Sequence, residues 1–150
     1  MTDAQVSVII ATNRGGPYLV GAVESLRAQT LQPTQIILVD DGSPGDEVRA
    51  AAAALGIDYV RQAALGVAAA RNRGAVLARG DWLAFLDDDD IWHPDRLRLQ
   101  VEALRAEPDA IACASGGWYM DAEGRRFGEW EQPRASSRAI LRGAAPLPRM

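Results

Sequence analysis

Short apolar runs recur along the chain, and each is bounded by polar or turn-forming residues. Runs of this length, without alternation, are typical of strands that are buried on both faces of a parallel sheet. They predict strands at Val6 to Ile10, Gln35 to Asp41, Ile57 to Gln62 and Asp81 to Leu86. We expect the last of these, which ends at a group of aspartates, to be the most deeply buried.

Segments with apolar residues at helical spacing separate these predicted strands. They predict helices over 18–29, from about 44 to 55, and over 66–78. Ser43 followed by Pro44 is typical of an N-cap and a first helical position, so we expect the second helix to begin there.

The alternation of strands and helices predicts an α/β fold with a mainly parallel sheet and right-handed crossovers. In such sheets, ligands bind outside the carboxyl ends of the strands. The polar clusters ATNR, DDGS and DDDD follow the first, second and fourth predicted strands. We therefore expect them to meet at one edge of the sheet, within a single domain over residues 1–150.

The last third of the chain has a weaker pattern. Pro94 can open a helix that runs to about Glu107. The segment 110–131 predicts two strands joined by a turn at Asp121 to Gly124. A short helix is predicted over 136–143.

The composition is that of an ordinary globular protein with a formal net charge of −4 at pH 7, so nucleic acid is not expected as a partner. All 16 cationic residues are arginine, which excludes a mechanism that needs a catalytic lysine. The single cysteine, Cys113, excludes an intramolecular disulfide, and its apolar neighbours predict a buried thiol.

The amino-terminal residues lack the pattern of a signal peptide, and no apolar segment is long enough to span a membrane. These observations predict a cytoplasmic protein without a transmembrane segment. Peripheral contact with the inner face of a membrane is compatible with them.

Four consecutive carboxylates, Asp87 to Asp90, follow the fourth predicted strand. Neighbouring like charges at ~4 Å repel by about 1 kcal/mol even in water. One or two acids favour the start of the following helix, but four exceed that role. A hard cation such as Mg²⁺ or Mn²⁺ relieves the repulsion, and it typically takes one or two protein carboxylates together with waters and phosphates. The cluster favours a metal shared with a phosphorylated ligand over a solvated loop, and both interpretations stay open.

Two other motifs have similar alternatives. In VDDGSPGD, Asp40 or Asp41 accepts either hydrogen bonds within the turn or hydrogen bonds from the base or ribose of a nucleotide. Arg71 and Arg73 are either surface residues of a helix or ligands for phosphate oxygens. His93, the only histidine, fits a packing or surface role better than a role as a metal ligand.

The motifs and their order resemble the nucleotide-sugar-binding half of the family 2 glycosyltransferases, which have the GT-A fold. The resemblance covers Gln5 to Ala106 and rests on VSVIIATNR, ILVDDGS and GVAAARNRGAVLARGDWLAFLDDDDIWHPDRL. It implies a Rossmann-like three-layer sandwich with a mainly parallel central sheet. It also implies that the chain is truncated before the C-terminal acceptor half.

The same resemblance implies the roles of individual residues. The positions that bind the nucleotide correspond to Ala11, Thr12, Asn13, Asp41, Arg71 and Asp88. Among them, Arg71 corresponds to a residue near the diphosphate and Asp88 to one near the ribose. The family's DXD motif corresponds to Asp87 through Asp89, and we expect Asp89 and Asp87 to ligate Mn²⁺ or Mg²⁺.

The implied reaction transfers a sugar from a nucleoside-diphosphate sugar, with a UDP-sugar favoured, to a hydroxyl of an unknown saccharide or lipid-linked acceptor. The general base is expected outside the chain. One alternative is a fragment that binds nucleotide and metal without transfer. Another is an α/β phosphoryl-transfer domain, which the lack of lysine disfavours. Open sheet edges predict self-association, for example as a homodimer.

Overall fold

The computed structural model describes residues 4–130. The chain divides into two compact units, Met1–Arg98 and Leu99–Met150, and each is described by itself. The expectation of a single domain over 1–150 stays a prediction. The helix predicted over 136–143 lies outside the described residues.

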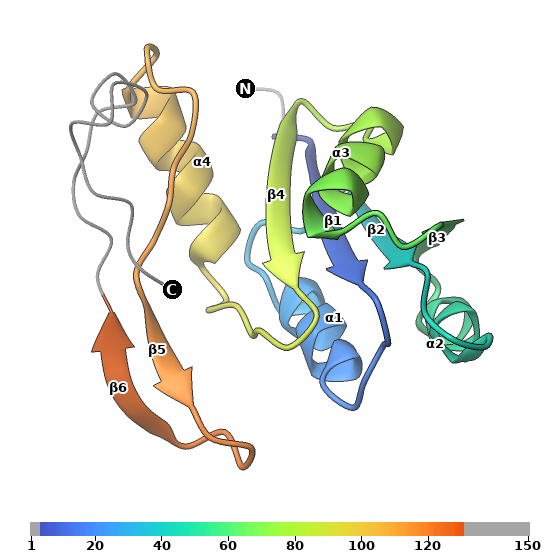
Figure 1. Cartoon of the computed structure of the whole chain (residues 1–150). Coiled ribbons are helices and arrows are strands. Elements are labelled where there is room, and N and C mark those ends of the chain that lie inside the picture. The colour runs from blue at the N-terminus through green and yellow to red at the C-terminus, as the bar shows by residue number, and fades with distance from the viewer. Residues whose placement is uncertain (1–3, 131–150) are drawn as a thin grey trace. The chain divides into compact units, whose positions relative to one another are not determined.

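The first unit is built on a four-stranded parallel sheet in the order β3–β2–β1–β4 (Figure 1). Its strands are β1 (Val6–Thr12), β2 (Gln35–Asp41), β3 (Asp58–Gln62) and β4 (Trp82–Asp87). All four predicted strands are confirmed, with ends that differ by two residues at most. The apolar runs of β1 and β2 form the centre of the sheet, where Val8, Ile10 and Leu38 are completely buried.

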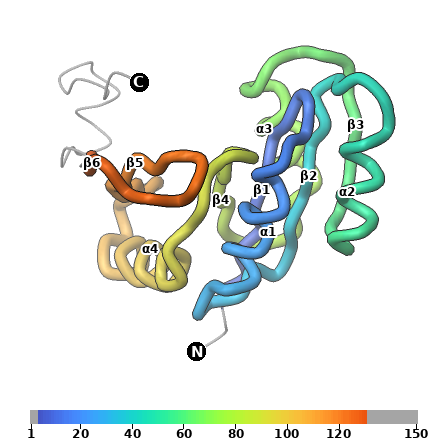
Figure 2. Tube along the Cα trace, turned by 90° about the horizontal axis from the view of Figure 1, so that it is seen from below, coloured from blue at the N-terminus to red at the C-terminus, as the bar shows by residue number. Residues whose placement is uncertain are grey.

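Three helices cover the two faces of this sheet: α1 (Leu19–Arg27), α2 (Glu47–Leu55) and α3 (Val67–Leu77). α1 and α2 lie on one face and α3 lies on the other (Figures 1 and 2). This arrangement follows from right-handed crossovers, because the chain adds β2 and β3 in one direction and then returns to add β4 in the other.

α3 packs closely on the sheet. Its Ala70 belongs to a buried cluster with Ile9, Ile37 and Val39 of β1 and β2. A Cβ atom added at Gly74 would lie 2.4 Å from Cγ2 of Ile9. Gly74 therefore permits the close approach of α3 to β1.

The reversal of direction creates a topological switch point in the sheet. β2 and β3 follow on one side of β1, whereas β4 pairs with β1 on the other side. The carboxyl ends of β1 and β4 therefore flank a position where α/β sheets bind ligands. The sequence prediction of an α/β fold with polar motifs at one edge is confirmed.

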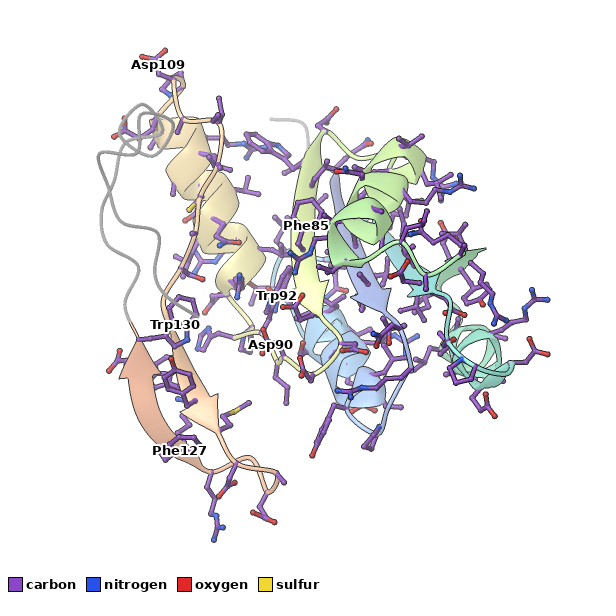
Figure 3. All side chains as sticks on the ribbon, in the orientation of Figure 1. Phe85, Asp90, Trp92, Asp109, Phe127 and Trp130 are labelled. Atoms are coloured by element: carbon purple, nitrogen blue, oxygen red, sulfur yellow. The ribbon has the colours of Figure 1, made fainter. Side chains whose placement is uncertain are left out.

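The position of β4 differs from the expectation. It is the outermost strand on its side of the described sheet, and Leu83 and Phe85 remain 46% and 43% exposed (Figure 3 labels Phe85). The prediction that it is the most deeply buried strand was wrong. An apolar run shows that a strand can be buried, but it does not identify the neighbours that cover it.

The start of α2 also differs from the expectation. Ser43 is not its N-cap; the helix begins at Glu47, after Asp46. The Ser43 hydroxyl donates instead to Oδ1 of Asp40 at 2.6 Å. Gly42 and Gly45 have positive φ values of 77° and 76°, so the intervening residues form a turn and not a first helical turn.

The helix predicted at Pro94 is present as α4 (Arg96–Ala106), which begins in the first unit and ends in the second. Near its start, the main-chain N–H of Leu97 donates to Oε1 of Gln29 at 3.0 Å. In residues 4–130, no helix is both long enough and apolar enough to cross a membrane.

The second unit contains the predicted antiparallel hairpin of β5 (Gly117–Met120) and β6 (Arg126–Trp130). Gly124, with a φ of 79°, lies in its turn. Cys113 precedes the hairpin and is exposed, so the prediction of a buried thiol was wrong. Residues 111–116 do not form a strand, and their apolar composition alone did not bury the thiol.

Candidate functional site

The carboxyl ends of β1 and β4 are joined by side chains. Thr12, the last residue of β1, donates its hydroxyl hydrogen to Oδ2 of Asp88. The same hydroxyl oxygen accepts the main-chain N–H of Gly15 at 2.9 Å, which holds the loop after β1 against the strand. Thr12 and Asp88 therefore lie together at the switch point.

A second pair lies at the same edge, on the α3 side. Nη2 of Arg71 is 2.5 Å from Oδ1 of Asp87, and the two side chains are 38% and 51% exposed. Asp87 is level with Ala11 of β1 in the register of the sheet. A guanidinium in this position can exchange a carboxylate for phosphate oxygens, because both ligands match its paired N–H groups.

Asp89 and Asp90 lie in the turn that follows β4 (Figure 3 labels Asp90). The turn is closed by the main-chain N–H of Asp90, which donates to the carbonyl oxygen of Asp87 at 3.2 Å. Loss of solvent around the Asp90 carboxyl, followed by the negative charges of Asp87 and Asp89, raises its pKa, and Arg96 opposes the shift. Desolvation first, and then the neighbouring carboxylates, therefore disfavour the ionised form of Asp90.

The acidic cluster is suited to a shared metal ion. Across residues 4–130, no three His, Cys, Asp or Glu side chains are grouped so that they could hold a metal ion by themselves. The cluster nevertheless offers carboxylate oxygens, which are the ligands that Mg²⁺ and Mn²⁺ prefer. Because Mg²⁺ typically takes one or two protein carboxylates, the donor set fits an ion whose other ligands are phosphate and water.

Asp41, the last residue of β2, accepts three hydrogen bonds from the end of β3 and the loop after it. Its Oδ1 accepts Nε2 of Gln62 at 2.8 Å and the N–H of Leu65 at 2.9 Å, and its Oδ2 accepts the N–H of Gly66 at 2.8 Å. The hydrogen bonds from Leu65, Gln62 and Gly66 outweigh desolvation and lower the pKa of Asp41. Asp41 is thus ionised at neutral pH and fixes the start of α3.

Asp40 points to the other face of the sheet and is only 1% exposed. Its Oδ1 accepts the N–H of Ser43 at 2.8 Å as well as the Ser43 hydroxyl, and its Oδ2 accepts the Tyr59 hydroxyl at 2.7 Å. Burial alone would raise the pKa of Asp40, but these hydrogen bonds and the charge of Arg61 lower it. Both carboxylates are therefore buried and hydrogen-bonded within the protein, Asp40 to the turn after β2 and to β3, and Asp41 to β3 and the loop after it.

Sequence reasoning missed three residues of this edge, all on β3. Tyr59 and Arg61 hold Asp40 and the turn after β2, and Nη2 of Arg61 donates to the carbonyl oxygen of Ser43 at 2.5 Å. Gln62 holds Asp41. The only available signal was the alternation in DYVRQ, which places Tyr59 and Arg61 on one face of the strand and Gln62 on the other.

The remaining predicted residues lie at or near the same edge. Ala11 is half-buried in β1, and Asn13 is exposed directly after it. Arg73 is exposed on α3, two residues beyond Arg71. His93 is exposed and its Nδ1 accepts the main-chain N–H of Asp95 at 3.2 Å, which agrees with a surface role.

This sheet order is common to several parallel α/β folds, and solved glycosyltransferases of the GT-A fold share it with this chain. The mannosyltransferase PcManGT from Pyrobaculum calidifontis, in complex with GDP-Man and Mn²⁺, matches with a TM-score of 0.63 and 21% identity over 77% of this chain and 36% of that chain. S. aureus TarS 1–349, in complex with UDP-GlcNAc, matches with a TM-score of 0.58 and 21% identity over 69% of this chain and 32% of that chain.

The chain belongs to glycosyl transferase family 2, whose family model matches residues 7–145. It is 39% identical over 111 residues to the succinoglycan biosynthesis protein ExoO of Rhizobium meliloti (strain 1021), covering 71% of this chain and 32% of that protein. It is 33% identical over 144 residues to the uncharacterized glycosyltransferase YibD of Escherichia coli (strain K12), covering 93% and 42%. The chain therefore spans between 32% and 42% of the length of these two relatives.

Proposed function

We propose that this chain is the donor-binding part of a glycosyltransferase that uses a nucleoside-diphosphate sugar and a divalent metal ion. The observation that carries the proposal is the convergence of Thr12, Asp41, Arg71 and Asp87–Asp89 at the carboxyl ends of neighbouring strands, around the switch point. Membership of the family, and the nucleotide sugars bound by PcManGT and TarS, support the same class of donor.

In this proposal, one group of residues contacts the nucleobase and another residue contacts the ribose. Ala11, Thr12 and Asn13 border the base at the end of β1, and Asp41 accepts a hydrogen bond from a base N–H group. Asp88 approaches the ribose hydroxyls. Its hydrogen bond to Thr12 ties the base and ribose positions together, because one residue bordering the base also orients the ribose ligand.

The diphosphate lies next to the acidic cluster. Arg71 exchanges Asp87 for phosphate oxygens when the donor binds, since it already lies within 2.5 Å of that carboxylate. Asp89 and Asp87 would hold Mn²⁺ or Mg²⁺ jointly with the phosphates. When bound, the ion offsets the negative charge that develops on the departing nucleoside diphosphate.

The sugar is transferred to a hydroxyl of a saccharide or lipid-linked acceptor. No acid after Asp90 is assigned as the general base that activates this hydroxyl. We favour a UDP-sugar as the donor, as the sequence resemblance implies.

Titration calorimetry of the chain with UDP in the presence of Mn²⁺ tests the proposal. We expect binding that is lost without Mn²⁺ and that is weakened at least about tenfold by Asp89→Ala, because one charged ligand of the ion is removed. Asp81→Ala is the matched control, since Asp81 is exposed at the opposite end of the same strand. It should leave the affinity for UDP unchanged.

Two outcomes would contradict the proposal. If none of UDP, GDP and dTDP binds in the presence of either metal, the chain has no donor site. If Asp81→Ala weakens binding as much as Asp89→Ala, the effect comes from net charge and not from a metal site. Incubation with donor sugars then distinguishes an enzyme from a binding module. Slow hydrolysis of the donor would indicate an enzyme, because it breaks the bond between the sugar and the diphosphate.

A further inference from the structure

A hydrogen-bonded network ties the segment after the acidic cluster to α1. The Ser25 hydroxyl oxygen accepts the main-chain N–H of Trp92 at 3.1 Å. Nε2 of Gln29 donates to the carbonyl oxygen of His93 at 2.8 Å, and its Oε1 accepts the main-chain N–H of Leu97 at 3.0 Å. Two side chains of one helix therefore hold the main chain at three positions shortly after the acidic cluster.

Both of these side chains are buried, and their polar atoms are used within the protein. The Ser25 hydroxyl also donates to the carbonyl oxygen of Ala22 at 2.7 Å, and Nε2 of Gln29 also donates to the carbonyl oxygen of Ser25 at 3.1 Å. The helix itself lies on the sheet, with Val23 and Leu26 completely buried. A buried network whose groups are hydrogen-bonded is rigid, so α1 gives the segment a fixed support.

The acidic turn lies between two fixed points. At its start, the last residue of β4 is held by the register with β1. At its end, Asp90 is two residues before the buried Trp92, whose main-chain N–H is held by Ser25 (Figure 3 labels Asp90 and Trp92). Neighbouring carboxylates of the turn repel one another. The restraint after the turn therefore limits where Asp88 and Asp89 can place their oxygens.

We propose that Ser25 and Gln29 are positioning residues for the divalent metal ion, because they hold the main chain that carries the carboxylate of Asp89. The inference rests on the proposed function, since it assumes that the ion binds at the acidic cluster. Mg²⁺ demands near-octahedral geometry at about 2.0–2.1 Å, so a small shift of a carboxylate weakens its binding. A site of this precision needs support from the residues around its ligands. α1 supplies that support after the turn, where the sheet no longer does.

The chain has a matched network at the other end of β4. There, the Ser7 hydroxyl oxygen accepts the main-chain N–H of Gly80 at 2.9 Å, and Oε1 of Gln35 accepts that of Arg79 at 2.9 Å. Ser7 and Gln35 are buried, as their counterparts on α1 are. One serine–glutamine pair therefore holds the chain where it enters β4, and the other holds it after it leaves. The first pair lies away from the acidic cluster and provides the control.

Titration calorimetry of the whole chain with UDP in the presence of Mn²⁺ tests the inference. Ser25→Ala leaves the main-chain N–H of Trp92 without its acceptor, and we expect the dissociation constant for UDP to rise about fivefold. Ser7→Ala removes the equivalent hydroxyl at the start of β4 and should leave this constant unchanged. Urea unfolding measures the stability that each variant loses, so that the affinities are compared at similar stability.

Gln29→Met removes the hydrogen bonds to His93 and Leu97 while keeping the length of the side chain. We expect UDP to bind about tenfold more weakly, because two contacts with the segment are lost. Gln35→Met is the control for this variant, and it should not change the affinity. The glutamine pair also carries the test if Ser25→Ala does not fold.

A double-mutant cycle tests whether the support acts through the metal-binding carboxylate. If Ser25 acts by placing Asp89, the effect of Ser25→Ala on UDP binding should fall below about twofold in the Asp89→Ala background, because the group that it places is gone. A general loosening of the fold would instead weaken binding by the same factor in both backgrounds.

The inference is wrong if Ser25→Ala and Gln29→Met bind UDP as tightly as the unmodified chain, or if their controls weaken binding equally. It is also wrong if the effect of Ser25→Ala is fully retained in the Asp89→Ala background. In each of these cases the unmodified chain still binds UDP with Mn²⁺, and the proposed donor site stands. If the unmodified chain binds none of UDP, GDP and dTDP with either metal, the proposed function itself fails. The two failures are therefore distinguishable.

Discussion

The two ends of the sheet contain the same kind of side-chain pair, and they use it differently. At the carboxyl ends, Gln62 donates to Asp41; at the amino ends, Gln35 donates to Asp58, and both distances are 2.8 Å. Gln35 also accepts the Ser7 hydroxyl at 2.9 Å, so it is engaged through both ends of its amide. Gln62 is held by Asp41 through its nitrogen.

The amino end is a closed network. Ser7 is completely buried and Gln35 is 7% exposed. The main-chain N–H groups of Arg79 and Gly80 donate to the Ser7 hydroxyl at 3.2 and 2.9 Å, which fixes the loop between α3 and β4. A polar network whose donors and acceptors are used internally holds a fold together.

A cavity of about 240 Å³ also lies at the amino end, away from the acidic motifs. Among the residues that line it, Arg79 pairs with Asp58 at 3.3 Å and Arg27 donates to the carbonyl oxygen of Leu55. Its charged groups are therefore already engaged with each other or with the main chain.

Asp40→Ala should have the largest effect, and it tests whether the carboxyl end is built around one buried carboxylate. The substitution leaves Ser43 and Tyr59 without their acceptor. We expect the free energy of unfolding to fall by about 3 kcal/mol, because buried donors lose a charged partner. Urea unfolding measures this change, and a loss below about 1 kcal/mol would show that Asp40 is not required to hold the turn.

Gly42→Ala should have the next largest effect. Gly42 has a φ of 77°, and an added Cβ would lie 2.8 Å from the main-chain nitrogen of Ala64. We expect a loss of about 2–3 kcal/mol, together with weaker UDP binding, because the turn after β2 and the loop after β3 are forced apart.

Gly56→Ala is the control for that substitution at the opposite end of the sheet. Gly56 has a similar φ of 61°, but an added Cβ would have no atom within 4 Å. It should cost only about 1 kcal/mol and leave UDP binding unchanged. Equal losses of stability in the two variants would mean that the contact with Ala64 is unimportant.

Ser7→Ala should destabilise the chain by about 1–2 kcal/mol, since the main-chain N–H of Gly80 loses its acceptor and Oε1 of Gln35 loses the Ser7 hydroxyl, whereas the N–H of Arg79 keeps Oε1 of Gln35. The affinity of the folded protein for UDP should not change, because Ser7 is at the end of the sheet away from the site. Thermal unfolding and calorimetry on the same sample separate the two quantities. A reduced affinity would show that the amino end of the sheet also affects the site.

The smallest effect concerns pH. The pKa values of Asp40 and Asp41 are lowered below the ordinary value of 3.8 in the folded protein. Their contribution to stability is therefore present above that value, and it is lost as the pH falls through the lowered values. Urea unfolding between pH 7 and pH 3 should show this loss, and Asp40→Asn should show less of it than the unmodified chain.

Much of the fold was predictable from the sequence. The strands β1 to β4, the helix α3 and the hairpin turn at Gly124 were located because local periodicity reports which segments bury an apolar face. The start of α2 was not located. Ser43 has the side chain of an N-cap, but Asp40 competes for it across the turn.

The sequence predicted which residues form the candidate site, but it did not predict which of them contact one another. Chain order alone brought Thr12, Asp41 and Asp88 to one edge, because parallel strands end at the same side of a sheet. The pairing of Arg71 with Asp87, and the hydrogen bond from Gln62 to Asp41, depend on registers between strands that are distant in sequence.

The sequence by itself determined that this chain forms a parallel α/β sheet whose acidic motifs stand where the strands end. It did so because hydrophobic periodicity, turn chemistry and chain order are properties of residues that are close in sequence. The tertiary structure alone decided that Asp40 is held by Ser43 and Tyr59 while Asp41 is held by Gln62 and the loop after β3, and that β4 is the outermost described strand on its side. These distinctions depend on which distant groups supply the hydrogen bonds and the covering surface.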